Sequence, residues 1–242
     1  MTETLAGDDA EQLLTHGDLT VEGRLVAASN ATLYCSITLA GVEAAAVYKP
    51  VAGERPLWDF PTGTLGHREL ATFVTSQATG WGIVPPTVWR DGPFGPGMVQ
   101  LWVTLDSSVD PVELIRRDDA QLRRIAVLDA VVNNGDRKGG HLLPTVAGHI
   151  YGIDHGVTFA LEPKLRTLLW QWEGRPLTDE ARDVLESLAR GLSDGGDLRR
   201  NLGAHLDVSE IDATRDRVDG LLRAGVHPSP PPDWPPIPWP PF

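Results

Sequence analysis

The chain changes its secondary-structure pattern near residue 105. Before this point, turn signals separate short stretches of alternating or β-branched residues, which predict strands at 19–26, 32–39, 42–48, 87–90 and 97–105. One helix is expected among them, over 65–78. After this point, a short hairpin is expected over 142–153, and apolar spacing predicts helices over 118–133, 178–192 and 209–224. Strands followed by helices favour an α+β fold, with an antiparallel sheet lobe and a mainly helical lobe.

These patterns divide the chain into four parts. Residues 1–18 are an acidic leader or short helix, residues 19–105 the sheet lobe and residues 106–227 the helical lobe. The last part, 228–242, is dense in proline and can form neither a helix nor a central strand. We expect it to be an extended tail that either packs on its own lobe or docks on a partner.

Charge and cysteine usage argue against several classes of function. A formal net charge of −12 argues against binding to nucleic acid or to an anionic membrane surface, because both attract Lys and Arg side chains. With Cys35 as its single cysteine, the chain can form no intrachain disulfide and no thiolate zinc cluster. The first residues lack the basic region of a signal peptide, and the apolar runs are too short to span a bilayer. We therefore expect a cytoplasmic protein.

Two acidic residues carry the strongest chemical signal. The helix predicted over 118–133 contains Asp129, expected to be a buried support, and runs into the polar loop Asn134-Gly135-Asp136-Arg137-Lys138. The hairpin that follows leads to Ile153-Asp154-His155-Gly156. Asp136 and Asp154 are therefore on loops that flank one hairpin. Phosphoryl transfer uses such a pair: one carboxylate orients or deprotonates the attacking hydroxyl, and another holds Mg²⁺ against the nucleotide phosphates.

These motifs resemble those of a known group of kinases. Asp136-Arg137-Lys138 with a polar residue at 141, followed by Ile153-Asp154-His155-Gly156, looks like the catalytic and metal-binding motifs of phosphoinositide 3-/4-kinase-related proteins. HipA-like bacterial kinases share the scheme. More closely, the chain resembles a family of small actinobacterial phosphatidylinositol 3-/4-kinase-like proteins, over about residues 23–175. The resemblance implies a two-lobed protein-kinase-like fold that uses ATP with Mg²⁺ or Mn²⁺.

The resemblance also assigns roles to single residues. Asp136 would be the acidic residue of the catalytic loop, and Asp154 the main Mg²⁺ ligand. Lys49, at the end of a predicted strand, would contact the phosphates, and Glu69 in the next helix would pair with it. Ser29 and Asn30 would lie in a turn over the phosphates. Adenine would lie against the hinge strand 98–103, where it would contact Gln100, Leu101, Trp102 and Val103.

His141 departs from the family pattern, which has a metal-binding Asn at this place. Asn offers a hard oxygen to Mg²⁺, whereas an imidazole nitrogen suits Zn²⁺, Mn²⁺ and other transition ions better. His141 is therefore a ligand of an altered metal site, a phosphate contact, or itself a phosphorylated residue.

The sequence leaves the phosphoryl acceptor open between a protein, including the chain itself, and a small molecule. It argues against a phosphoinositide, because a polyanionic head group needs basic side chains after the metal-binding Asp, and residues 157–172 offer only Lys164 and Arg166. Two other functions stay open. One is an ATP-binding pseudokinase that regulates without turnover, which His141 favours; the other is an ATP-grasp-like transferase, which the order of the motifs disfavours.

Overall fold

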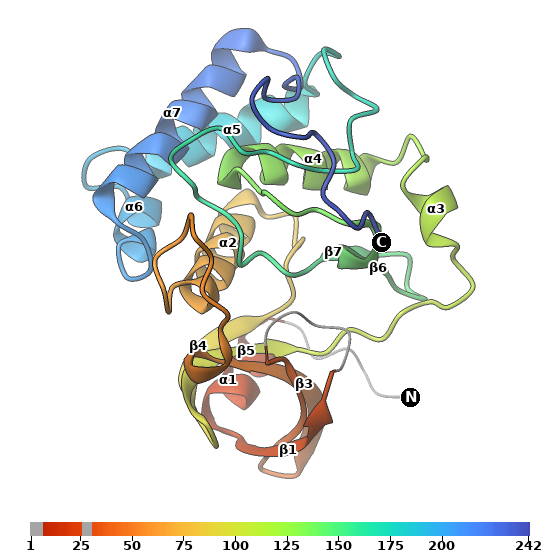
Figure 1. Cartoon of the computed structure of the whole chain (residues 1–242), viewed down its shortest axis with the longest axis vertical. Coiled ribbons are helices and arrows are strands. Elements are labelled where there is room, and N and C mark those ends of the chain that lie inside the picture. Colours follow the sequence, from red (N-terminus) through yellow and green to blue (C-terminus); the bar gives the residue numbers. More distant parts are fainter. Residues whose placement is uncertain (1–6, 26–30) are drawn as a thin grey trace.

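The computed structural model describes residues 7–25 and 31–242, which form a sheet lobe and a helical lobe (Figure 1). Strands fill the first part of the chain and most of the helices follow, which confirms the α+β fold with an antiparallel sheet lobe and a mainly helical lobe. Ser29 and Asn30, the predicted turn over the phosphates, lie outside the described residues.

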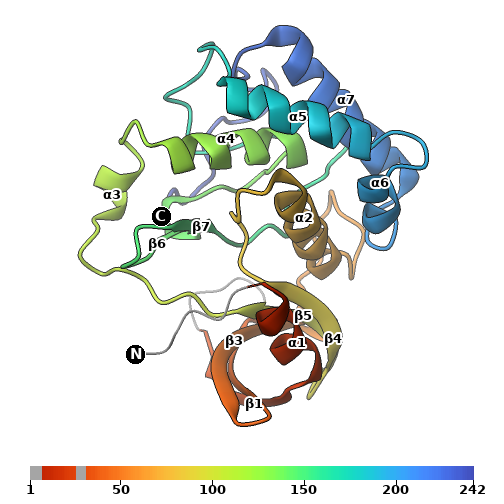
Figure 2. The same ribbon diagram turned by 180° about the vertical axis from the view of Figure 1, so that it is seen from behind.

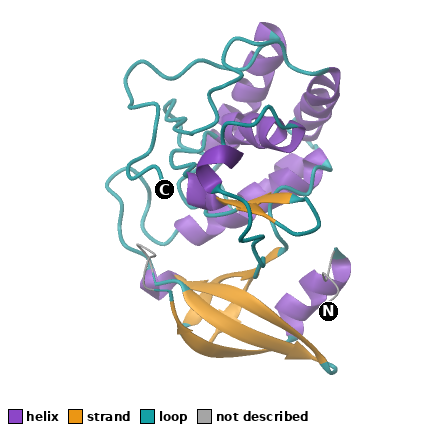
Figure 3. Cartoon of the chain, turned by 90° about the vertical axis from the view of Figure 1, so that its right-hand side faces the viewer, coloured by secondary structure: helices purple, strands orange, loops and turns teal. Residues whose placement is uncertain are grey.

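Five antiparallel strands form the sheet, in the spatial order β1-β2-β3-β5-β4. They are β1 (Asp18–Arg24), β2 (Leu33–Leu39), β3 (Val42–Pro50), β4 (Thr87–Gly92) and β5 (Gly95–Leu101). Alternate residues of β2, such as Cys35 and Ile37, are fully buried, because successive side chains on a strand point to opposite faces. The strongly curved sheet (Figure 3) packs these residues against Leu13 and Leu14 of α1 (Asp8–His16), which forms the smaller of the two main cores.

Helix α2 (Leu65–Thr79) lies between the sheet and the helical lobe, as Figure 2 shows from behind. It packs on β4 and β5 and also on helices of the second half of the chain. Arg68 is buried, pairs with Glu210 and donates a hydrogen bond of 2.6 Å to the Thr158 carbonyl oxygen. The helix ends at Gly80, whose φ of 70° is in the left-handed region that glycine adopts without strain. Polar contacts therefore tie α2 to the helical lobe.

The helical lobe holds the larger core. Its central helix, α4 (Ala120–Val132), is buried along most of its length and begins where Asp119 accepts a hydrogen bond of 2.7 Å from the Gln121 amide. Around it lie α3 (Pro111–Leu114), α5 (Asp179–Gly191), α6 (Asp197–Leu202), α7 (Val208–Ala224) and the hairpin of β6 (Leu142–Pro144) and β7 (Ile150–Gly152). None of the described helices is both long enough and apolar enough to cross a membrane.

The structure corrects the predicted end of the hinge strand. β5 ends at Leu101, whereas the alternating pattern predicts a strand as far as Leu105. The last pairs of β5 are those of Gln100 with Thr87 and of Leu101 with Ala46. β4 begins at Thr87, so later residues have no strand partner on that side, while on the other side the Trp102 amide still donates to the Ala45 carbonyl oxygen at 3.0 Å. The sequence pattern also misses α3 and α6, because helices of 4 and 6 residues are too short to show a helical period.

Buried histidines make the fold sensitive to acid. Burial lowers the pKa of His67, His205 and His227, and that of His227 falls from 6.5 to about 4. His227 is only 4% exposed, and its Nε2 accepts a hydrogen bond of 3.1 Å from the Arg123 guanidinium. The folded chain therefore keeps this imidazole neutral.

We expect the free energy of unfolding to fall as the pH is lowered from 6.5 to about 4. In that range the unfolded chain binds a proton at His227 that the folded chain does not, so acid favours unfolding. For His227 alone the loss is on the order of 2–3 kcal/mol. Urea unfolding at several pH values checks this, with His227→Gln as the matched variant. Equal slopes of stability against pH in both proteins would contradict it.

Candidate active site

Three charged side chains from distant segments meet between the lobes. Lys49, near the end of β3, places its Nζ 2.5 Å from Glu69 Oε1 on α2 and 2.8 Å from Asp154 Oδ1 beyond β7. Burial alone would lower the pKa of Lys49, but the carboxylates of Asp154 and Glu69 raise it. Lys49 in turn holds the pKa of Asp154 well below its usual range. Lys49 and Asp154 are therefore both charged at neutral pH.

The backbone around Asp154 fixes its carboxylate at this place. Its φ of 61° lies in the left-handed region, which Asp tolerates better than most residues. On one side, the Ile153 amide donates to the His141 carbonyl oxygen at 3.0 Å; on the other, the His155 amide donates to Glu69 Oε2 at 3.1 Å. The Asp154 side chain is 47% exposed, so it is held firmly and still open to a ligand.

Asp136 lines the same cavity as Lys49 and Asp154. Its amide donates to Asn134 Oδ1 at 2.9 Å, and its Oδ2 lies 3.1 Å from Lys138 Nζ. Burial raises the pKa of Asp136, while the neighbouring Lys138 opposes this shift. A carboxylate with a raised pKa is better suited to take a proton from a hydroxyl than an ordinary Asp.

A buried ion pair supports the loop that carries Asp136, as expected for Asp129. Asp129 on α4 and Arg137 on the loop are fully buried, and Arg137 Nη2 and Nε donate to Asp129 Oδ1 and Oδ2 at 2.9 and 3.0 Å. The same guanidinium donates to the Ile153 carbonyl oxygen at 2.9 Å and lies 2.5 Å from His155 Nε2. Arg137 therefore fixes the Asp136 loop to the segment that carries Asp154.

His141 also reaches Asp154. Its Nε2 lies 3.3 Å from Asp154 Oδ2, so this carboxylate contacts Lys49 through one oxygen and His141 through the other. Burial lowers the pKa of His141 to about 4, although the Asp154 carboxylate acts in the opposite direction. The imidazole is neutral at pH 7, and can either donate a hydrogen bond to Asp154 or offer a nitrogen lone pair to a metal.

Asp154 and His141, the two predicted metal ligands, have no third protein ligand beside them among the described residues. Within residues 7–25 and 31–242, no group of three or more His, Cys, Asp or Glu side chains is placed to hold a metal ion. A metal at Asp154 and His141 would therefore need further ligands from water or from a bound substrate, which is the usual situation of Mg²⁺ on nucleotides.

A cavity of about 220 Å³ contains the acidic pair. Glu54, on the loop before α2, accepts a hydrogen bond of 2.9 Å from the Gly66 amide and so holds this loop against the start of the helix. The lining combines charged groups with a few apolar ones: Ala31, Lys49, Pro50, Glu54, Arg55, Leu57, Leu65, Gly66, Glu69, Asp136, Asp154, Gly156 and Val157.

The predicted hinge residues lie at the end of β5 and outside the lining of this cavity. The Leu101 amide donates a hydrogen bond of 2.9 Å to the Pro86 carbonyl oxygen, and the Trp102 amide donates one of 3.0 Å to the Ala45 carbonyl oxygen. The buried Gln100 side chain donates to Thr87 Oγ1 at 2.9 Å. Adenine contacts through these residues and Val103 stay predictions, and the Leu101 and Trp102 amides are engaged within the protein.

The sequence motifs indicate no role for Lys138, for His155 or for the loop 54–57. Lys138 has a visible signal, because it follows Asp136 by two positions on the same polar loop. The loop 54–57 has none, since a segment rich in Gly and Pro shows no period, and only the folded chain brings it to the cavity.

The chain is similar to a protein of Mycobacterium tuberculosis over nearly its whole length. Protein Rv2133c of Mycobacterium tuberculosis is 43% identical over 270 aligned positions, which cover 97% of this chain and 96% of that protein. No family model matches the chain. Among solved structures, the proinflammatory kinase CtkA of Helicobacter pylori is similar with a TM-score of 0.49 and 10% identity, over 88% of this chain and 94% of that one.

Proposed function

The chain belongs to the family of the Mycobacterium tuberculosis protein Rv2133c, and we propose that it is an ATP-dependent phosphotransferase. The observation that carries the proposal is the meeting of Lys49, Glu69 and Asp154 beside Asp136 in one cavity. Protein kinases use this arrangement for nucleotide phosphates: a strand Lys held by a helix Glu, next to a metal-binding Asp. We assign the protein to the atypical kinases related to phosphatidylinositol 3-/4-kinases and place it in the cytoplasm.

ATP and Mg²⁺ fit the residues that are present. Lys49 would contact phosphate, and Asp154 would hold the metal with His141 as its neighbour. The Asp154 carboxylate suffices as a protein ligand for Mg²⁺, because this ion usually keeps several waters and binds substrate phosphates directly. When bound, the metal would neutralise negative charge on the phosphates.

Transfer itself would depend on Asp136. Its carboxylate accepts the proton of the acceptor hydroxyl as the acceptor oxygen bonds to the terminal phosphorus of ATP and the bond from that phosphorus to ADP breaks. Lys138, 3.1 Å from Asp136 Oδ2, holds the carboxylate in position.

The acceptor we propose is a protein or a small molecule and not a phosphoinositide. The two basic residues of 157–172 are both engaged within the protein: Lys164 Nζ lies 3.0 Å from Asp59 Oδ2, and Arg166 Nη2 donates to the Ile237 carbonyl oxygen at 3.4 Å. Lys164 is thus committed to Asp59, and the single remaining cation, Arg166, is too little charge for a polyanionic head group. Phosphorylation of phosphatidylinositol vesicles would contradict this part of the proposal.

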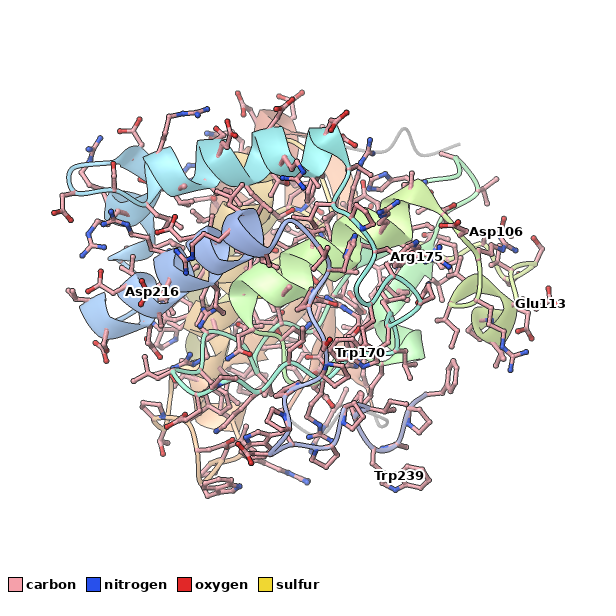
Figure 4. The ribbon with its side chains drawn as sticks, turned by 90° about the horizontal axis from the view of Figure 1, so that it is seen from above. Asp106, Glu113, Trp170, Arg175, Asp216 and Trp239 are labelled. Carbon is pink, nitrogen blue, oxygen red and sulfur yellow. The ribbon has the colours of Figure 1, made fainter. Side chains whose placement is uncertain are left out.

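Incubation of the purified chain with γ-labelled ATP, and with each divalent metal in turn, tests the function. We expect ATP binding by calorimetry together with released or transferred label. Asp154→Asn should lose at least about tenfold in turnover, because one charged metal ligand is gone. Glu113→Gln, which changes an exposed acid on α3 (Figure 4), is the matched control. A chain that neither binds nor hydrolyses ATP with any metal would refute the proposal.

His141→Asn is expected to raise turnover with Mg²⁺ relative to Mn²⁺, by about severalfold. The substitution replaces a neutral imidazole nitrogen next to Asp154 with a hard amide oxygen, which Mg²⁺ prefers. Initial rates with the two metals, measured for both proteins, give the ratio directly. An unchanged ratio would show that residue 141 does not bind the metal.

The second candidate is an ATP-binding pseudokinase. The observation that favours it is the contact of His141 with Asp154, since this imidazole stands where these kinases place a metal-binding Asn. Tight ATP binding without turnover, in the presence of Mg²⁺ and of Mn²⁺, would decide for this function.

A further inference from the structure

The C-terminal tail, residues 228–242, ends on the loop that carries Asp136. The Gly139 amide donates to the Pro241 carbonyl oxygen at 2.9 Å. The Phe242 ring lies directly over Gly139, so close that a Cβ at this position would collide with it. The last residues of the chain therefore cover part of the active-site loop.

The same tail also pairs with the segment 164–170. The Pro236 carbonyl oxygen accepts hydrogen bonds from the Thr167 amide at 3.0 Å and from Trp170 Nε1 at 2.9 Å. Figure 4 shows Trp170 beside the tail and Trp239 pointing away from the body of the protein. Thr167 itself forms a parallel bridge with Arg137 of the active-site loop. Loop, segment and tail thus lie side by side as one strip.

An aromatic stack anchors the other end of this strip. The ring of Trp234 stacks on that of Trp58, with centroids 6.3 Å apart and planes 14° apart. Lys164 Nζ lies 4.8 Å from the centre of the Trp234 ring. Trp58 follows Leu57, which lines the cavity. The tail is therefore held at the loop before α2 through Trp234 and at Gly139 through Phe242.

These contacts occupy main-chain groups to which a bound, extended polypeptide would form hydrogen bonds. A peptide that binds in extended form gains affinity from main-chain hydrogen bonds to free amides and carbonyls. Beside Asp136, the amides of Gly139 and Thr167 are already bonded to the tail. Residues 230–242 contain no Ser, Thr or Tyr, so this part of the tail offers no hydroxyl of its own as an acceptor.

We propose that the tail closes this face to polypeptides, and that the phosphoryl acceptor is a small hydroxyl-bearing molecule that reaches Asp136 through the cavity. The proposal rests on the phosphotransferase function proposed above and narrows its acceptor. Asp136 lines this cavity and no residue of 228–242 does, so the tail leaves this route to the Asp136 carboxylate uncovered. The acceptor hydroxyl gives its proton to Asp136, its oxygen bonds to the terminal phosphorus of ATP, and ADP leaves.

The test compares the full chain with a variant that ends at Pro232. Both are incubated with γ-labelled ATP and Mg²⁺, first with a degenerate Ser/Thr/Tyr peptide library and then with a panel of sugars, polyols and nucleosides. Trp234→Ala is a second, milder variant that weakens the anchor, and Trp239→Ala is the matched control, since Trp239 is 84% exposed. Hydrogen exchange follows the Gly139 and Thr167 amides as markers of tail release, with the Phe159 amide, bonded to Val132, as the marker of an intact fold.

The full chain and Trp239→Ala should label members of the small-molecule panel and leave the peptides unlabelled. The shortened chain and Trp234→Ala should show faster exchange at Gly139 and Thr167, and the shortened chain should gain at least about tenfold in peptide labelling. Peptide labelling by the full chain at the rate of the shortened one would overturn the inference while leaving the phosphotransferase function intact. Absence of ATP hydrolysis and of transfer in every chain would overturn that function, and the inference with it.

Discussion

Replacing Asp136 with Asn is expected to lower the rate of phosphoryl transfer by about 10²–10⁴-fold, the usual contribution of a general base. Asn keeps the size of the side chain and a hydrogen-bond acceptor near Lys138, so the fold and the contacts of Lys49 and Asp154 should survive. ATP affinity should therefore change little. Initial rates with labelled ATP, together with calorimetric titration of ATP, separate the two effects.

Asp216→Asn, which neutralises an exposed acid on α7, is the control for this substitution. The pH profile of the unmodified protein gives a further check. Because burial raises the pKa of Asp136, activity should be lost on acidification at a higher pH than for an ordinary Asp, and this acidic limb should disappear in Asp136→Asn. A variant that retains the full rate would remove Asp136 from the mechanism.

Asp129→Ala is expected to lower the free energy of unfolding by about 3–5 kcal/mol, because it leaves the buried Arg137 guanidinium without its carboxylate. Both side chains are fully buried, so water cannot replace the lost partner without opening the core. The loop that carries Asp136 should loosen at the same time, since Arg137 also holds the Ile153 carbonyl oxygen. Chemical denaturation measures the first effect, and hydrogen exchange of the loop amides the second.

Asp129→Asn is the matched variant, because an amide oxygen still accepts hydrogen bonds from Arg137 and Asn134. We expect it to be clearly less destabilising than Asp129→Ala. A loss below about 1 kcal/mol for Asp129→Ala would mean that the ion pair is replaceable and contributes little to the position of the loop.

The sequence predicted those parts of the site whose signals are local. The helix expected over 118–133 is α4, Ala120–Val132, and the loop after it carries Asp136 as expected. The strand that ends near Lys49 and the helix that contains Glu69 also follow from patterns of a few residues. The ion pair of these two residues was implied by the resemblance to the kinase family, since neither local pattern states which side chains meet.

Other features depend on partners far away in the sequence and leave no local pattern. The alternation of apolar residues continues past Leu101, but pairing with β4 stops there, because β4 begins at Thr87, opposite Gln100. Proline density predicts an extended tail, but no local pattern indicates that Pro241 and Phe242 contact Gly139. Arg68 could equally have paired with the adjacent Glu69, and instead it reaches Glu210 in α7.

Because polar contacts hold α2 to the helical lobe, two members of the cluster of Lys49, Glu69 and Asp154 move with that lobe and the third moves with the sheet. Glu69 and Asp154 are carried by segments joined through the His155 amide and Arg68, whereas Lys49 is carried by the sheet. If the sheet rocks against the helical lobe, both ion pairs of Lys49 stretch together while the contact between Glu69 and His155 keeps its length. The ¹⁵N resonance of the Lys49 ammonium would therefore report any such motion without an added label.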